Sequence, residues 1–156
     1  MIDKVVLDAS VVIDLFAGRN KERVRVTEAL FECFQKKGIK LLAPRLLLVE
    51  VAGVLVRFIP PERVASVISI LKESVITVPD DIFYEDAVEL ALSTGSRGAD
   101  SYYLGVAKVM DAVLVTSDKV QAINAKRAKI RSFYVLSEGN DLLAMLGCHD
   151  GGSRDN

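Results

Sequence analysis

Val113-Leu114-Val115-Thr116-Ser117-Asp118 is a short run rich in β-branched residues that ends in an acid, and it decides how the rest of the chain is interpreted. Val5-Val6-Leu7-Asp8, near the start, has the same design. Short runs of this kind are typical of strands buried on both faces of a parallel sheet. If both strands lie centrally in one sheet, Asp8 and Asp118 emerge together at its carboxyl edge.

Helical patterns alternate with such strands along the chain. Helices are expected over residues 10–16, 22–37, 45–58, 80–92, 100–110 and 118–125, with one more that starts at Pro61 or Glu62. Further strands are expected over 39–43, 75–78 and 131–136. This alternation predicts an α/β fold, a three-layer α/β/α sandwich with a mostly parallel central sheet. We expect a single domain over residues 1–146 and a disordered, polar and Gly-rich tail over 147–156.

Composition excludes several classes of protein. The net charge of −1 argues against binding nucleic acid through bulk charge, although a local basic patch can still attract phosphates. There is no signal-like start and no apolar segment of 18 residues, so we expect a cytoplasmic protein without a membrane span. Cys33 and Cys148 are far apart and form no CxxC pair, so reduced thiols are expected rather than a disulfide or a zinc site.

Glu50 is the only acidic residue of an apolar helix that runs from Leu46 to Leu55, and we expect this helix to be largely buried. An unpaired buried carboxylate is costly. Glu50 could pair with Arg45 or Arg57, or it could bind a cation.

Asp100 heads the expected core-facing stripe of the helix over 100–110, where the helix dipole also favours an acid. With Asp8, Glu50 and Asp118 it would form a cluster of four carboxylates. Two such charges about 4 Å apart repel by roughly 4 kcal/mol at an effective dielectric of about 20, so the ionised cluster needs a cation. Oxygen ligands favour Mg²⁺ or Mn²⁺ over zinc.

Each acid also has an ordinary structural explanation. Asp8 could begin an Asx turn or cap a helix, and Asp100 and Asp118 are common N-cap residues. All the ordinary explanations together would require a coincidence, which favours the metal site. We assign Asp14 and Asp111 to turns and solvent.

Four segments that span nearly the whole chain match one family. They are Val6-Leu7-Asp8-Ala9-Ser10, Glu50 within its apolar helix, Arg97-Gly98-Ala99-Asp100-Ser101-Tyr102-Tyr103-Leu104-Gly105-Val106-Ala107, and Leu114-Val115-Thr116-Ser117-Asp118. In the order and spacing of these segments the chain resembles the PIN-domain ribonucleases, and specifically the VapC-like toxins of prokaryotic toxin–antitoxin pairs.

The resemblance implies a Mg²⁺- or Mn²⁺-dependent ribonuclease in which a metal-activated water attacks the RNA phosphodiester. The implied catalytic metal ligands are Asp8, Glu50, Asp100 and Asp118. Ser10 and Thr116 would orient the carboxylates or the water. The resemblance also implies a homodimer that a small antitoxin protein inhibits.

RNA phosphates must approach this acidic groove, and Arg97 and Lys119 are the nearest cations in the sequence. We expect these two residues to bind RNA, and we assign the basic residues over 126–131 mainly to solvated surface. Two other functions stay open. The same fold with an impaired metal site could be an RNA-binding or scaffolding module. An aspartyl-phosphate phosphotransferase or phosphatase would use Asp8, but it needs a second acid where Ala9 and Ser10 stand.

Overall fold

The computed structural model describes residues 1–149 of the chain. In chain order its elements are β1 (Lys4–Leu7), α1 (Ala9–Ala17), α2 (Lys21–Lys37), β2 (Lys40–Pro44), α3 (Leu46–Leu55), α4 (Pro61–Ser74), β3 (Ile76–Val78), α5 (Asp80–Thr94), α6 (Gly98–Val109), β4 (Val113–Thr116), α7 (Lys119–Arg127), β5 (Ser132–Tyr134) and α8 (Val135–Met145).

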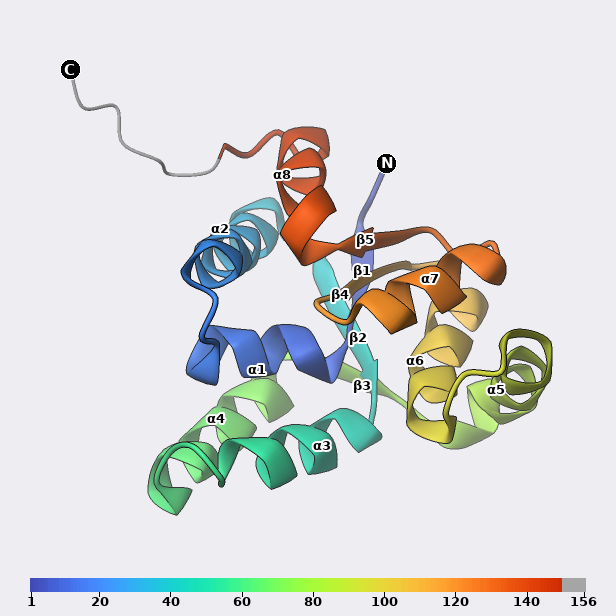
Figure 1. The fold of residues 1–156 in the computed structure, drawn as a ribbon, viewed down its shortest axis with the longest axis horizontal. Helices are drawn as coiled ribbons and strands as arrows, with labels where there is room; N and C mark the ends of the chain where they lie inside the picture. The colour runs from blue at the N-terminus through green and yellow to red at the C-terminus, as the bar shows by residue number, and fades with distance from the viewer. Residues whose placement is uncertain (150–156) are drawn as a thin grey trace.

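Five parallel strands form one sheet in the order β3-β2-β1-β4-β5. The central strand is β1, in which Val6 pairs with Leu42 of β2 on one side and with Leu114 of β4 on the other. Helices α1 to α4 and α8 lie on one side of the sheet, and α5 to α7 lie on the other (Figure 1). The structure therefore confirms the predicted three-layer sandwich around a parallel sheet.

The central strands are buried on both faces because helices cover both sides of the sheet. Val5, Val6 and Leu7 of β1 and Leu114 and Val115 of β4 are fully buried. This explains why both strands are continuous apolar runs rather than alternating ones. Within the described residues, no helix is both long and apolar enough to cross a membrane.

The strand order places a crevice at the carboxyl ends of β1 and β4. The chain leaves β1 toward β2 and leaves β4 toward β5, so the two connections diverge from adjacent strands. Ligands of open α/β sheets bind at such a switch point. Asp8 directly follows β1, and its backbone N–H donates to the carbonyl oxygen of Val115 at 3.1 Å.

Helix α8 was not predicted from the sequence. The strand expected over 131–136 is shorter, and the chain turns into α8 directly after it. Gly139 and Asn140 are poor helix formers, which obscures the helical pattern. Gly139 is required by packing, because a Cβ atom there would clash with the side chain of Val26 on α2.

Cys33 and Cys148 form a disulfide bond, so the expectation of reduced thiols was wrong. They are 115 residues apart, and only the packing of α8 against α2 brings them together. The backbone N–H of Cys148 also donates to the carbonyl oxygen of Leu143 at 2.8 Å. Gly147 and Cys148, expected to belong to a disordered tail, thus have defined contacts. Residues 150–156 of that tail lie outside the described residues.

Candidate active site

Asp8 lies at the switch point and is only 6% exposed. Its Oδ2 accepts hydrogen bonds from the hydroxyls of Ser10, at 2.6 Å, and Thr116, at 2.7 Å. Burial raises the pKa of this carboxyl to about 6. The two hydroxyls oppose that rise, whereas the nearby charges of Asp100 and Glu50 add to it. Asp8 is therefore a buried acid whose ionised form is disfavoured by desolvation and by the negative charges of two other acids.

Ser10 and Thr116 connect the ends of β1 and β4. Their hydroxyl oxygens lie 3.3 Å apart, and each also accepts a backbone hydrogen bond from the segment after β4. The N–H of Ser117 donates to Ser10 Oγ, and the N–H of Asp118 donates to Thr116 Oγ1, both at 3.0 Å. The two residues that were predicted to support the acids thus contact Asp8 and also position the segment that carries Asp118.

Glu50 reaches the same edge from α3. Its Oε1 accepts a hydrogen bond from the hydroxyl of Tyr103 on α6 at 2.8 Å. Tyr103 is fully buried, and burial raises the pKa of its hydroxyl, which therefore stays protonated as a donor. Desolvation raises the pKa of Glu50, and the charge of Asp100 raises it further.

Helix α3 is less buried than the sequence suggested. Glu50 is half-buried, and Val49 beside it is 69% exposed. The helix packs inward mainly through Leu47, Val51 and Leu55. Glu50 pairs with neither of the arginines considered for it. The partner is a tyrosine 53 residues away, which sequence spacing does not reveal.

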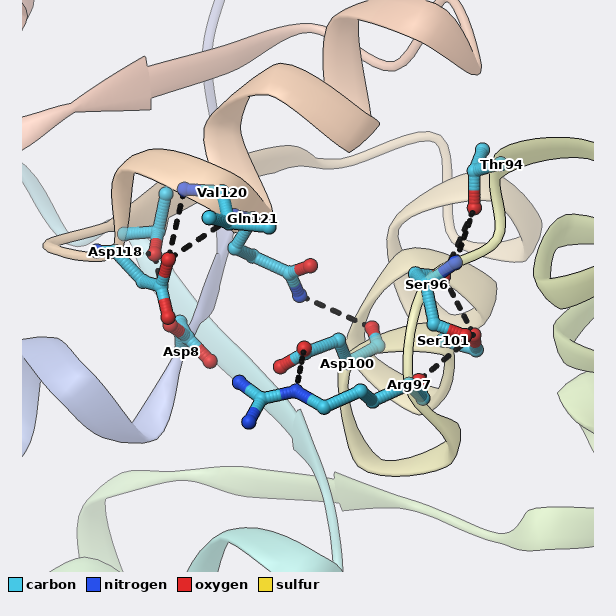
Figure 2. Close-up of polar contacts among 10 residues, drawn as sticks. Asp8, Thr94, Ser96, Arg97, Asp100, Ser101, Asp118, Val120 and Gln121 are labelled. Atoms are coloured by element: carbon cyan, nitrogen blue, oxygen red, sulfur yellow. Dashed lines mark hydrogen bonds and ion pairs between the residues drawn. The ribbon is translucent and has the colours of Figure 1, made fainter.

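Asp100 lies in the first turn of α6 and forms an ion pair with Arg97, whose Nε is 3.1 Å from Asp100 Oδ2. The Arg97 side chain is 79% exposed, whereas that of Asp100 is 14% exposed. The hydrogen bond to Asp100 and its charge raise the pKa of Arg97, with smaller contributions from Asp118 and Glu50. Figure 2 shows the guanidinium turned toward the Asp100 carboxylate.

Asp118 is the N-cap residue of α7, which is the structural role that the sequence also allowed for it. Its Oδ1 accepts hydrogen bonds from the N–H groups of Val120, at 2.8 Å, and Gln121, at 3.2 Å. Lys119 follows it and is exposed. The cap fixes the Asp118 side chain through one oxygen only.

Gln121 is a site residue that sequence reasoning missed. It is fully buried, and its Nε2 donates to the backbone carbonyl oxygen of Asp100 at 3.0 Å, so that α7 is tied to the first turn of α6 (Figure 2). The signal was present, because Asp118 and Gln121 have the spacing of an N-cap and its N3 residue. Here the glutamine side chain bonds to another helix instead of its own.

Asp14 and Asp111, both assigned to turns and solvent from the sequence, differ in their surroundings. Asp111 is exposed and follows α6 in a left-handed conformation with φ 49°, which agrees with a turn role. Asp14 is not a solvent residue. It is 5% exposed and forms an ion pair with Arg23, whose Nε lies 2.7 Å from Asp14 Oδ2.

The four predicted acids share one pattern. Each accepts hydrogen bonds or an ion pair through one oxygen, and its second oxygen takes no hydrogen bond from any described residue. The engaged oxygens are Asp8 Oδ2, Glu50 Oε1, Asp100 Oδ2 and Asp118 Oδ1. Four held carboxylates with one available oxygen each suit a hard divalent cation chemically.

The acids do not yet surround a single point. Over residues 1–149, no three acidic, histidine or cysteine side chains are arranged as a ligand set. The sequence predicted that the acids meet at one edge and converge tightly enough to demand an ion. The structure brings Asp8, Glu50 and Asp100 within electrostatic reach of one another, but side chains must move before they share a metal.

Comparisons with known proteins show the family and the fold of this chain. The sequence profile of the PIN domain matches residues 5–127, and no curated protein matches the chain in sequence. Among solved structures, the chain is similar to PAE2754 from Pyrobaculum aerophilum, with a TM-score of 0.65 and 19% identity over 94% of this chain and 98% of that one. It is also similar to FitAcB from Neisseria gonorrhoeae, with a TM-score of 0.59 and 15% identity over 85% of this chain and 99% of that one.

The profile covers all four acids and ends with α7. PIN domains are typically nucleases that use divalent metals. The two structural similarities, at such low identity, support the fold. The chain therefore belongs to the PIN domain family.

Proposed function

We propose that this chain is a Mg²⁺- or Mn²⁺-dependent ribonuclease that hydrolyses RNA phosphodiesters. The observation that carries the proposal is the pattern of the four carboxylates, each held through one oxygen and available through the other. Asp8, Glu50, Asp100 and Asp118 would hold the cation. A divalent ion at such a site lowers the pKa of a water and stabilises charge on phosphate oxygens.

The remaining residues have roles that follow from their contacts. Ser10 and Thr116 fix the orientation of Asp8, and Tyr103 fixes that of Glu50. Gln121 holds the first turn of α6, and with it Asp100, against α7. Such supporting groups keep ligand oxygens in place before the substrate arrives.

Arg97 and Lys119 supply the positive charge that RNA needs at this edge. Both are exposed, and each lies close in sequence to one of the acids. Contacts from arginine and lysine to phosphate oxygens position a nucleic acid without reading its sequence. They would bring a phosphodiester to an otherwise repulsive groove.

The decisive test is cleavage of a single-stranded RNA by the purified protein with Mn²⁺ or Mg²⁺, with and without EDTA. Wild type should cut only with the free ion, and Asp8→Asn should lose the activity. The matched control is Asp111→Asn, because the same chemical change is made in an exposed turn where asparagine tolerates the left-handed backbone. Equal cleavage by wild type and Asp8→Asn would defeat the proposal.

The open arrangement of the acids gives one specific reason to keep a second function in view. A PIN domain that binds RNA without cutting it needs no shared metal, and over residues 1–149 the acids do not form a ligand set. RNA binding without cleavage in Mg²⁺ and in Mn²⁺ would favour that module over the nuclease.

We also propose that the nuclease is the toxin of a toxin–antitoxin pair, a homodimer inhibited by a small antitoxin protein. The support is the resemblance of the site segments to the VapC-like toxins, together with the PIN domain match. Expression of the chain alone should arrest bacterial growth, and Asp8→Asn should not. A small open reading frame next to the gene should encode a protein that relieves the arrest. Growth arrest of equal strength by Asp8→Asn would contradict this role.

A further inference from the structure

Arg97 is placed unusually for a surface cation. Its side chain is mostly exposed, yet its guanidinium turns back onto Asp100, a carboxylate with little exposure of its own. Arg97 Nε donates a hydrogen bond of 3.1 Å to Asp100 Oδ2. A side chain with free access to solvent thus neutralises one of the four acids.

The charge of Arg97 acts on more than its direct partner. Asp118 and Glu50 both attract the guanidinium, in addition to Asp100. In Figure 2 it extends from the start of α6 to the Asp100 carboxylate. The guanidinium therefore stands among the carboxylates whose repulsion a bound cation would relieve.

The main chain around Arg97 is anchored, which confines movement to its side chain. Ser101 Oγ donates to the backbone carbonyl oxygen of Arg97 at 3.0 Å and lies 2.7 Å from Ser96 Oγ. Thr94 Oγ1 joins the same cluster through Ser96 at 2.9 Å (Figure 2). Rotation about the side-chain bonds is enough to take the guanidinium out of the groove.

We propose that Arg97 is an internal counter-ion of the acidic site, and that a divalent cation and the guanidinium compete for the Asp100 carboxylate. This inference rests on the proposed function for the identity of the cation, but it does not require RNA cleavage. Asp100 keeps one oxygen clear of this contact, but the positive charge of Arg97 beside it opposes the approach of a divalent ion. An ion pair with one largely exposed partner is weak, so a divalent ion can displace it.

The test measures Mn²⁺ affinity by calorimetry for wild type, Arg97→Gln and Lys119→Gln. Both variants remove one exposed positive charge next to a site acid, but only Arg97 is paired with one. Arg97→Gln should bind Mn²⁺ about threefold to tenfold more tightly, because a competing charge has gone. Lys119→Gln should change the affinity by less than about twofold, since an exposed charge is screened. Equal affinities for the two variants would overturn the proposal.

A second readout follows the ion pair itself. The Arg97 Nε–Hε resonance, assigned by its loss in Arg97→Gln, should shift when Mg²⁺ is added to wild type. The same resonance in Asp100→Asn should already lie near the shifted position without Mg²⁺. A resonance that stays in place at saturating Mg²⁺ would contradict the competition.

The outcomes separate this inference from the proposed function. Tighter Mn²⁺ binding by Arg97→Gln without any RNA cleavage by wild type would overturn the ribonuclease and leave the counter-ion role supported. Cleavage by wild type with unchanged Mn²⁺ affinity in Arg97→Gln would do the reverse. No Mn²⁺ binding by any variant would overturn both.

Discussion

The two edges of the sheet differ in how well their charges are balanced, although the chain as a whole has a net charge of only −1. The carboxyl edge carries the four acids of the candidate site. At the amino edge a cavity of about 810 Å³ opens between the start of β1 and the ends of α6 and α7. The cations that line this cavity are Lys4, Lys108, Arg127, Lys129 and Arg131.

Helix dipoles explain part of this separation. Helices α6 and α7 begin near the acids and end at the basic cavity. Asp100 in the first turn of α6, Asp118 at the N-cap of α7 and the cations in the last turns of both helices are therefore stabilising. At the amino edge the charges are also balanced locally. Lys108 lies 3.0 Å from Asp86 and 3.6 Å from Glu89, and Asp111 lines the same cavity.

The dipole does not explain Asp8 or Glu50. Asp8 precedes α1 but its side chain makes no capping hydrogen bond, and Glu50 lies in the middle of α3. Both carboxyls have raised pKa values because they are desolvated close to other acids. Unrelieved charge of this kind marks a functional site, whereas the balanced charge at the amino edge is what folding alone favours. The cavity at the amino edge is thus not where we expect the chemistry.

The largest effect should come from Asp8→Asn, which separates function from stability. We expect Mn²⁺-dependent cleavage to fall by about a hundredfold or more. Because the folded pKa of about 6 lies above the value of 3.8 for the free group, ionised Asp8 destabilises the metal-free protein above pH 6, and the penalty disappears below pH 4. The variant should therefore be more stable than wild type by about 2 kcal/mol at pH 7 in EDTA, with the gain lost near pH 4.

Urea unfolding of wild type, Asp8→Asn and Asp111→Asn at pH 7 and pH 4 measures this difference. Asp111→Asn should change neither cleavage nor its pH dependence, because Asp111 lies in an exposed turn. If Asp8→Asn instead destabilised the metal-free protein at pH 7, the negative charge at the carboxyl edge would not be unfavourable, and the contrast with the balanced amino edge would fail.

The next effect should come from Thr116→Val, which removes the hydroxyl shared by Asp8 and the N–H of Asp118. Cleavage should fall by about tenfold to a hundredfold, and stability by about 1–3 kcal/mol, because a buried donor loses its partner. Thr27→Val is the matched control. Thr27 is also fully buried, but its hydroxyl donates to the carbonyl oxygen of Arg23 within α2. Equal loss of activity in both variants would show that the Thr116 hydroxyl has no special role.

A smaller effect is expected for Tyr103→Phe, which leaves Glu50 without its hydrogen bond. Glu50 is half-buried, so water can replace the hydroxyl in part, and cleavage should fall by about threefold to tenfold. Tyr102→Phe is the comparison, because Tyr102 packs edge-on against Phe83 and removal of its hydroxyl should leave turnover near that of wild type. Steady-state cleavage rates of the two variants decide the point.

The smallest effect should follow from changes at the amino edge. The double variant Arg127→Gln, Lys129→Gln removes two exposed cations from the basic cavity. RNA cleavage should stay within about twofold of wild type. The two cations are exposed to screening by salt and lie at the edge of the sheet opposite the candidate site. A loss clearly greater than about twofold would reverse the comparison and make the basic cavity part of the RNA path.

The sequence was sufficient for the parts of the site that depend on local order. Apolar runs ended by Asp8 and Asp118 predicted both strands and the edge at which their acids emerge. The spacing of Arg97 and Asp100 also placed a cation beside an acid. These features follow from the periodicity of helices and strands, which a single sequence contains.

Contacts between distant elements could not be predicted in this way. Tyr103 meets Glu50, and Gln121 meets the carbonyl of Asp100, only because α3, α6 and α7 pack at particular angles. Helix α8 was missed because Gly139 interrupts its helical pattern, although that glycine is what allows close contact with α2. Without α8, nothing placed the two cysteines together.

The Cys33–Cys148 bond gives the molecule a covalent topology that its fold alone does not have. Residues 33–148 form a closed ring that contains four of the five strands and three of the four site acids. The central strand β1, with Asp8, belongs to the open arm before the ring. A proteolytic nick in any loop of the ring would leave its fragments joined, whereas a nick between α1 and α2 would sever the peptide that carries Asp8.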